Sequence, residues 1–187
     1  METGMTFAKI PLALLALTFL SACAGQQVAP TGEDDAFSKT VATGTFKNAN
    51  GEAIGEVQLT ETTGQVRLSA KISGLTAGQR GFHLHQTGSC ESPDFKSAGG
   101  HLNPLDRSHG SKSEGGSHLG DLPNLITNEA GQSMLTAKFT NHAEQVLAWI
   151  FDEDGTAVMI HAEPDDYLTD PTGAAGPRVA CAVLVRP

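Results

Sequence analysis

Basic residues are scarce in this chain of 187 residues. It carries 12 Lys and Arg against 21 Asp and Glu, which gives a formal net charge of -9 at pH 7. Proteins bind nucleic-acid phosphates through a surplus of Lys and Arg, so this composition argues against nucleic acid as a partner. It also sets a condition on any anionic substrate, because a local positive patch would have to override the overall negative field.

Long apolar runs are lacking as well. The run over 10–20 is too short to span a bilayer comfortably; it follows Lys9 and ends just before Cys23. This is typical of an export signal, and its end resembles a bacterial lipobox, in which the cysteine is lipidated and becomes the first mature residue. We therefore expect a signal peptide over 1–22 and a periplasmic protein anchored by a lipid on Cys23. Ala24 after the cysteine favours the outer membrane.

Two features of this N-terminus stay open. Ordinary signal cleavage near Ala22 or Ala24 is an alternative, and it would leave a soluble protein. Either Met1 or Met5 can be the true start, because Glu2 is unusual in a positively charged leader.

Cysteine is used sparingly, with three residues in all. A lipid anchor would consume Cys23, and the remaining pair, Cys90 and Cys181, can then join each other in an oxidising periplasm. Closing a loop of this length would stabilise the fold by about 4 kcal/mol on the chain-entropy model.

No segment after the signal shows a convincing helix of three turns. Residues 23–37 are polar and predict a flexible tether. From residue 38 onward, segments rich in Val, Thr, Ile and Phe recur between turn residues, as strands do. The candidate strands are 40–47, 57–59, 66–72, 80–86, 133–140, 146–151, 156–161 and 179–185. The pattern predicts an all-β domain over 38–187, an eight-stranded antiparallel Greek-key barrel or sandwich.

Two long segments, 87–132 and 162–178, interrupt the strands and are rich in Gly, Pro, Asp and Ser. Loops of this length inside a compact domain are uncommon unless they are functional or fastened. The first one holds three histidines and Cys90, so a metal ion and a disulfide could fasten it.

Histidine is concentrated, because five of the seven residues fall within 36 positions. His83 and His85 are two apart on a predicted strand, so both rings share a face and can reach one metal ion. The long loop then supplies three histidines and an aspartate: His101, His109, His118 and Asp121. Such a closed set suits a structural zinc. The alternatives are ordinary hydrogen-bonded histidines and a hydrophilic loop.

Three other polar residues carry little information by themselves. His161, at the end of a predicted strand, is expected to be a satisfied core or rim histidine, and His142 is expected to be exposed. Arg178 stands alone in a loop rich in Gly and Pro, and without a family resemblance a solvated surface charge would be its ordinary interpretation.

Four stretches, in this order and spacing, resemble the copper-zinc superoxide dismutase family, especially its bacterial periplasmic members: GFHLH, SAGGHLNP, HG followed by HLGDLPNL, and GPRVACAVL. The resemblance covers roughly residues 40–187. It implies copper and zinc as cofactors and superoxide as substrate. It implies the copper ligands His83, His85, His101 and His161, and the zinc ligands His101, His109, His118 and Asp121.

The same resemblance implies further roles. Asp165 would link His83 to His109 and fix both rings. His101 would carry a proton during the copper cycle, and Arg178 would dock the anion. The resemblance also pairs Cys90 with Cys181, which would tether the loop near Arg178.

The chain departs from the family pattern in one respect, since no lysine precedes Arg178 in 162–178. We expect Lys96, or failing that Lys112, to take over the steering of superoxide. The competing interpretations are a non-catalytic metal-binding lipoprotein of the same fold and a structural or adhesive sandwich without metal. A zinc hydrolase is disfavoured by the lack of a His-Glu-x-x-His motif. The sequence leaves the oligomeric state open.

Overall fold

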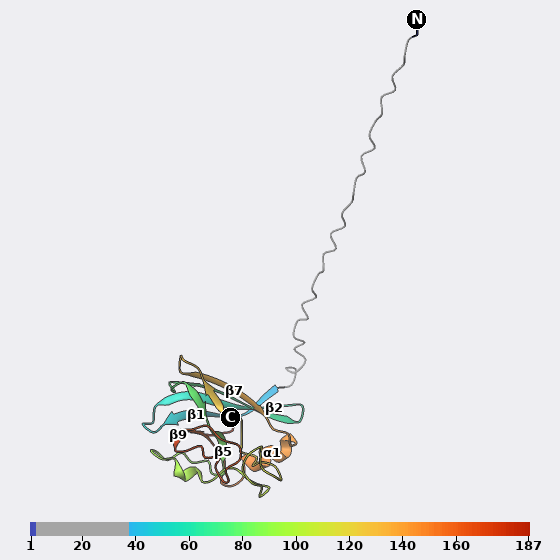
Figure 1. Cartoon of the computed structure of the whole chain (residues 1–187). Coiled ribbons are helices and arrows are strands. Elements are labelled where there is room, and N and C mark those ends of the chain that lie inside the picture. The colour runs from blue at the N-terminus through green and yellow to red at the C-terminus, as the bar shows by residue number, and fades with distance from the viewer. Residues whose placement is uncertain (3–37) are drawn as a thin grey trace. The chain divides into compact units, whose positions relative to one another are not determined.

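The computed structural model describes residues 1–2 and 38–187 (Figure 1). The chain separates into two units, Met1–Gly32 and Glu33–Pro187, and all the helices and strands described belong to the second unit. Met1 and Glu2 aside, the expected signal peptide over 1–22, the lipidation of Cys23 and the tether over 23–37 lie outside the described residues. Among the residues described, no helix is long and apolar enough to cross a membrane.

Within residues 38–187, nine antiparallel strands form one sheet, in the order β4-β6-β7-β3-β2-β1-β9-β8-β5. The two outermost strands, β4 and β5, are consecutive in the chain with Gly81 between them, so the sheet curls into a nearly closed barrel (Figure 1). The prediction of an all-β antiparallel barrel is confirmed. The strands are β1 Ser38–Asn48, β2 Ala53–Thr62, β3 Gln65–Ser73, β4 Gly78–Arg80, β5 Phe82–His85, β6 Leu125–Thr127, β7 Gln132–Lys138, β8 Ala157–His161 and β9 Arg178–Val183.

The described residues form nine strands rather than the expected eight, because two strands are gained and the expected strand over 146–151 is lost to a helix. The expected strand over 80–86 is interrupted at Gly81, so its start pairs with β6 and its end pairs with β8. The short β6, Leu125–Thr127, lies inside the expected loop 87–132.

The barrel interior follows from the two-residue period of the strands. In β3, Val66, Leu68, Ala70 and Ile72 are buried while the residues between them are exposed or half-buried. These side chains join the main apolar cluster, which draws on every strand except β4 and fills the barrel. Alternation of this kind is what a strand needs to bury one face.

The predicted strand over 146–151 is wrong. Residues Ala143–Ile150 form the helix α1, whose buried side chains are Ala143, Val146 and Ile150. Spacings of three and four residues place them on one helical face against the main apolar cluster. A helix of eight residues shows barely two turns of this period, so in the sequence its apolar residues look like a short strand.

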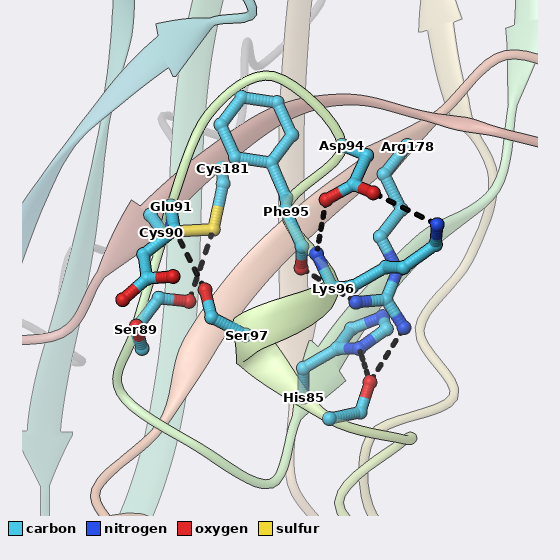
Figure 2. The surroundings of a disulfide bond; sticks show 11 residues. His85, Ser89, Cys90, Glu91, Asp94, Phe95, Lys96, Ser97, Arg178 and Cys181 are labelled. Atoms are coloured by element: carbon cyan, nitrogen blue, oxygen red, sulfur yellow. Dashed lines mark hydrogen bonds and ion pairs between the residues drawn. A yellow bond between two sulfur atoms is a disulfide. The ribbon is translucent and has the colours of Figure 1, made fainter.

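A disulfide fastens the first long loop to the sheet. Cys90 in the loop bonds to Cys181 on β9 with a Cα–Cα distance of 5.7 Å, which confirms the predicted pairing (Figure 2). Beside it lies a second, smaller apolar cluster formed by Phe95, Ala98, Ala157, Met159 and Cys181, with Cys90 against it. The loop also contains the short 3-10 helix η1, Lys96–Ala98.

Candidate metal centre

Six histidines and two aspartates meet between the sheet and the two long loops. β5 positions His83 and His85, whose neighbours Phe82 and Leu84 belong to the main apolar cluster on the other side of the strand. β8 runs antiparallel to β5 and ends at His161, whose N–H donates to the Gly81 carbonyl at 2.9 Å. A β-carbon at Gly81 would overlap Ala175, so this residue allows the close approach.

The first set of donors consists of imidazoles alone: His83, His85, His101 and His161. One ring nitrogen of each lies within 4.8 Å of the others, and all four residues are buried. The Nε2 atoms of His85 and His161 are 3.4 Å apart. His83 Nδ1 and His101 Nε2 are buried and have no hydrogen-bond partner. Buried polar atoms are almost always paired, so a bound metal ion accounts for these nitrogens better than an empty interior.

The second set combines three imidazoles with one carboxylate. Asp121 Oδ1 lies 3.0 Å from His101 Nδ1 and 3.1 Å from both His109 Nδ1 and His118 Nδ1. Ligand atoms of a tetrahedral zinc site, each about 2.0 Å from the ion, are separated by about 3.3 Å. The three separations from Asp121 Oδ1 are close to this value, so the donor set fits zinc.

Backbone groups orient the Asp121 carboxylate. Its Oδ2 atom accepts the N–H groups of Gly110 at 2.8 Å and His118 at 3.0 Å, which turns Oδ1 toward the three rings. Burial acts to raise the pKa of Asp121, but the hydrogen bonds from His101, His118 and Gly110 hold that pKa well below its usual range. The carboxylate is thus ionised, as a metal ligand must be.

His101 belongs to both sets. Its Nδ1 atom faces Asp121, and its Nε2 atom is the unpaired nitrogen that faces the all-imidazole set. One imidazole ring can therefore contact two metal ions at once.

Asp165 links the two sets through the ring nitrogens of His83 and His109 that face away from them. Its Oδ2 atom accepts His83 Nε2 at 2.7 Å and its Oδ1 atom accepts His109 Nε2 at 3.0 Å. Because Nε2 of each ring contacts Asp165, Nδ1 of His83 points into the first set and Nδ1 of His109 into the second. These hydrogen bonds fix the tautomer and the orientation of both rings. Gly173, with φ 65°, makes room for this link, because a β-carbon there would overlap both the Asp165 carboxylate and the His109 ring.

Three rings of the first set, those of His85, His101 and His161, are neutral at neutral pH. Burial lowers the pKa of His85 to about 2, of His161 to about 3 and of His101 to about 4. Neutral imidazoles with free lone pairs are what a transition metal requires. Burial also acts to lower the pKa of His118, but the hydrogen bond and charge of Asp121 raise it.

Arg178 lies at the edge of the first set and is half-buried. The Gly99 carbonyl accepts both Arg178 Nη2, at 2.5 Å, and His85 Nδ1, at 2.9 Å (Figure 2). The Phe95 carbonyl accepts Arg178 Nη1 at 2.6 Å. Arg178 is thus held beside His85 by two backbone carbonyls.

The two lysines singled out as steering groups differ in their surroundings. The Lys96 ammonium is paired with Asp94 at 2.8 Å, with the two side chains 83% and 55% exposed, on the loop that contacts Arg178 (Figure 2). Lys112 Nζ donates to the Asp166 carbonyl at 2.9 Å, next to the ring of Tyr167. His142 is exposed and precedes α1, as expected.

Three residues that shape the site carried no signal in the sequence. Asn124 and Tyr167 hold the backbone around Asp165, and Phe95 holds the loop around Arg178. Their partners lie 41 to 83 residues away along the chain, so no local pattern marks them.

Comparison with known proteins is consistent with this geometry. A family model described as Copper/zinc superoxide dismutase (SODC) matches residues 53–184. The chain is 40% identical over 140 residues to Superoxide dismutase (Cu-Zn) 2 of Aquifex aeolicus, covering 73% of this chain and 82% of the relative. It is 34% identical over 185 residues to Superoxide dismutase (Cu-Zn) of Escherichia coli, covering 94% and 98%. The crystal structure of a SOD-like protein from Bacillus subtilis superimposes with a TM-score of 0.73 at 34% identity, over 79% of this chain and 100% of that one.

Proposed function

The chain belongs to the copper/zinc superoxide dismutase family, and we propose that it converts superoxide into dioxygen and hydrogen peroxide at this pair of donor sets. The observation that carries the proposal is His101, which presents one ring nitrogen to each of two adjacent donor sets. An imidazole shared in this way would serve as a ligand of both metals, a redox metal in one set and a structural metal in the other.

The donor sets fit the two metals that the family implies. His83, His85, His101 and His161 would hold copper, and His101, His109, His118 and Asp121 would hold zinc. Bound copper supplies the one-electron chemistry, because imidazole ligands suit both of its oxidation states whereas zinc has no redox chemistry. The zinc set is filled entirely by protein groups, so its role is structural.

His101 is the residue placed to move a proton. When zinc is bound, Nδ1 would be its ligand, and a neutral His101 ring would then carry its single proton on Nε2, which faces the copper set. Without that proton, Nε2 has a free lone pair and can act as a metal ligand. With the proton, Nε2 can no longer do so. Hydrogen peroxide needs two protons, and Nε2 can hold one of them where the product forms.

Arg178 is the residue placed to dock the anion. Its guanidinium lies beside His85, and its two hydrogen bonds to described residues both go to neutral carbonyls. Its charge therefore stays available to a small anion, which a charge-assisted hydrogen bond would hold. A local positive group of this kind is what the net charge of -9 demands of an anion-using site.

We also propose that residues 38–187 form the catalytic domain and that Cys23 carries it on the periplasmic side of the outer membrane. The Cys90–Cys181 disulfide supports an oxidising compartment, since such bonds persist there and are rare in the cytosol.

The test combines metal content with activity in the whole protein and in His161→Ala. Copper and zinc per chain are measured together with the rate of superoxide consumption. We expect about one copper and one zinc per chain in the wild type, and at least a hundredfold loss of activity with retained zinc in the variant. A fully metal-loaded wild type without activity would instead favour a non-catalytic metal-binding protein, and an undiminished variant would contradict the ligand assignment.

A further inference from the structure

Phe95 occupies an unusual position in the first long loop. Its backbone lies in the left-handed region, with φ 54° and ψ 24°, and its side chain is fully buried. The left-handed region is unfavourable for a residue with a side chain, so it persists only where the surroundings enforce it. Something other than local preference therefore holds this turn in place.

The ring of Phe95 is the main anchor of an otherwise exposed stretch. From Glu91 to Asp94 every residue is exposed, and Lys96 after it is exposed too. The ring packs in the small apolar cluster with Met159 and Cys181, next to the disulfide (Figure 2). The stretch is thus fastened at Cys90 by the disulfide and again at Phe95 by apolar burial.

The carbonyl of the same residue faces the opposite way, toward Arg178. It accepts Arg178 Nη1 at 2.6 Å, while the Gly99 carbonyl accepts Arg178 Nη2 at 2.5 Å (Figure 2). Gly99 is itself tied to the metal centre, since it accepts His85 Nδ1. Two carbonyls four residues apart thus set the position of the guanidinium. Gly99 has no side chain, so only the Phe95 carbonyl belongs to a residue that a buried side chain anchors.

We infer that Phe95 is a positioning residue: its buried ring holds the left-handed turn whose carbonyl fixes Arg178 beside the metal centre. The inference rests on the proposed function in one respect, namely that Arg178 docks the anion. Without the ring, the turn would relax toward ordinary backbone angles, and the Phe95 carbonyl would move away from the guanidinium. The Gly99 carbonyl alone would then leave Arg178 free to rotate.

The test uses the whole, metal-loaded protein and azide, a small monovalent anion whose binding to Cu(II) gives an absorption band. Phe95→Ala is expected to weaken azide binding about fivefold, the net effect of losing one ordinary hydrogen bond. Phe95→Gly removes the ring as well, and glycine adopts left-handed backbone angles without strain. It should therefore weaken azide binding as much as Phe95→Ala does. Phe95→Leu restores apolar burial and should return the affinity to within about twofold of the wild type.

Two comparisons separate positioning from general damage. Leu68→Ala empties a similar volume in the main apolar cluster on β3 and should leave azide affinity unchanged despite lower stability. In an Arg178→Ala background, Phe95→Ala should cause no further weakening, because the residue acts through Arg178.

The outcomes are distinguishable. If Arg178→Ala does not weaken azide binding, the proposed anion dock fails and the role of Phe95 fails with it. If Arg178→Ala weakens binding and Phe95→Ala does not, or if Phe95→Ala weakens it equally in both backgrounds, the inference on Phe95 is wrong while the dock survives. Should Phe95→Ala fail to fold, Phe95→Val enters the same comparison under the same criteria.

Discussion

Asn124 and Asp165 hold each other through two hydrogen bonds. Asn124 Nδ2 donates to the Asp165 carbonyl at 2.9 Å, and the Asp165 N–H donates to Asn124 Oδ1 at 2.8 Å. The Asn124 N–H in turn donates to the Tyr167 hydroxyl at 2.8 Å. A residue just past the zinc-set aspartate therefore fixes the backbone of the carboxylate that links His83 to His109.

This arrangement predicts that Asn124→Ala loosens the zinc set although Asn124 touches no proposed ligand. We expect zinc affinity to fall about tenfold, and about a hundredfold for Asp165→Asn, because outer residues that orient ligand rings contribute on this scale. Competition with a chelator of known zinc affinity measures both. Asn48→Ala, which removes a side chain that caps the β1–β2 turn, is the matched control. Equal zinc affinity in Asn124→Ala and in the control would contradict the prediction.

Charge at the mouth of the site is predicted to set the rate at low salt. Lys96 is paired with Asp94, so Asp94 offsets the steering that the lysine would otherwise provide. Lys96→Glu should lower the superoxide rate constant and flatten its ionic-strength dependence, whereas Asp94→Asn should raise the low-salt rate. The differences should fade at about 0.15 M salt and above, where the Debye length is about 8 Å. Lys112→Glu is the comparison, and an unaltered rate and salt profile in Lys96→Glu would rule out steering by this residue.

The metal-free protein is predicted to lose stability as the pH falls below about 6.5. Burial holds the pKa of His85 at about 2, of His161 at about 3 and of His101 at about 4, against an ordinary value of 6.5. Between about pH 6.5 and pH 4 the unfolded chain therefore binds protons that the folded protein does not. For each such proton, the free energy of unfolding falls by about 1.4 kcal/mol per pH unit. The lowered pKa of Asp165 acts in the same direction at still lower pH, because the folded state then loses a favourable carboxylate.

Urea unfolding of the metal-free protein at a series of pH values measures this slope. His85→Gln removes one of the three titrating rings, so its slope should be smaller by about 1.4 kcal/mol per pH unit. His142→Gln, which makes the same substitution at an exposed position, is the control. A metal-free protein whose stability does not change between pH 7 and pH 4 would contradict the prediction.

Removal of the disulfide is predicted to destabilise the protein. Cys90→Ser with Cys181→Ser should lower the free energy of unfolding by about 4 kcal/mol, because the bond closes a loop of 91 residues. Denaturant unfolding measures this free energy. Unfolding of the wild type in the presence of a reductant, which breaks the disulfide, gives a second measurement for the protein without the bond. A double variant as stable as the oxidised wild type would show that the bond does not constrain the unfolded chain.

Local patterns in the sequence account for a large part of the fold. Alternating burial in β3 and the His83 and His85 pair on β5 both follow from the two-residue period of a strand. The helix α1 is too short for its period to stand out, and Gly81 is required by contact with Ala175 from a distant loop, which no local pattern indicates.

In the candidate site too, local sequence patterns predict some residues, whereas others depend on contacts with distant segments. The spacing within the loop that carries His101, His109 and His118 marks a ligand set, but His161 and Arg178 acquire meaning only from the family resemblance. Asn124 and Phe95 act through contacts with distant segments, and nothing in the neighbouring sequence predicts such contacts.

The most direct test of the two-metal account is a crystal structure of the loaded protein with anomalous diffraction recorded at the copper and zinc absorption edges. The account predicts one copper peak enclosed by His83, His85, His101 and His161. It predicts one zinc peak enclosed by His101, His109, His118 and Asp121, with the His101 ring between the two. A single metal peak, or two peaks that His101 does not separate, would contradict it.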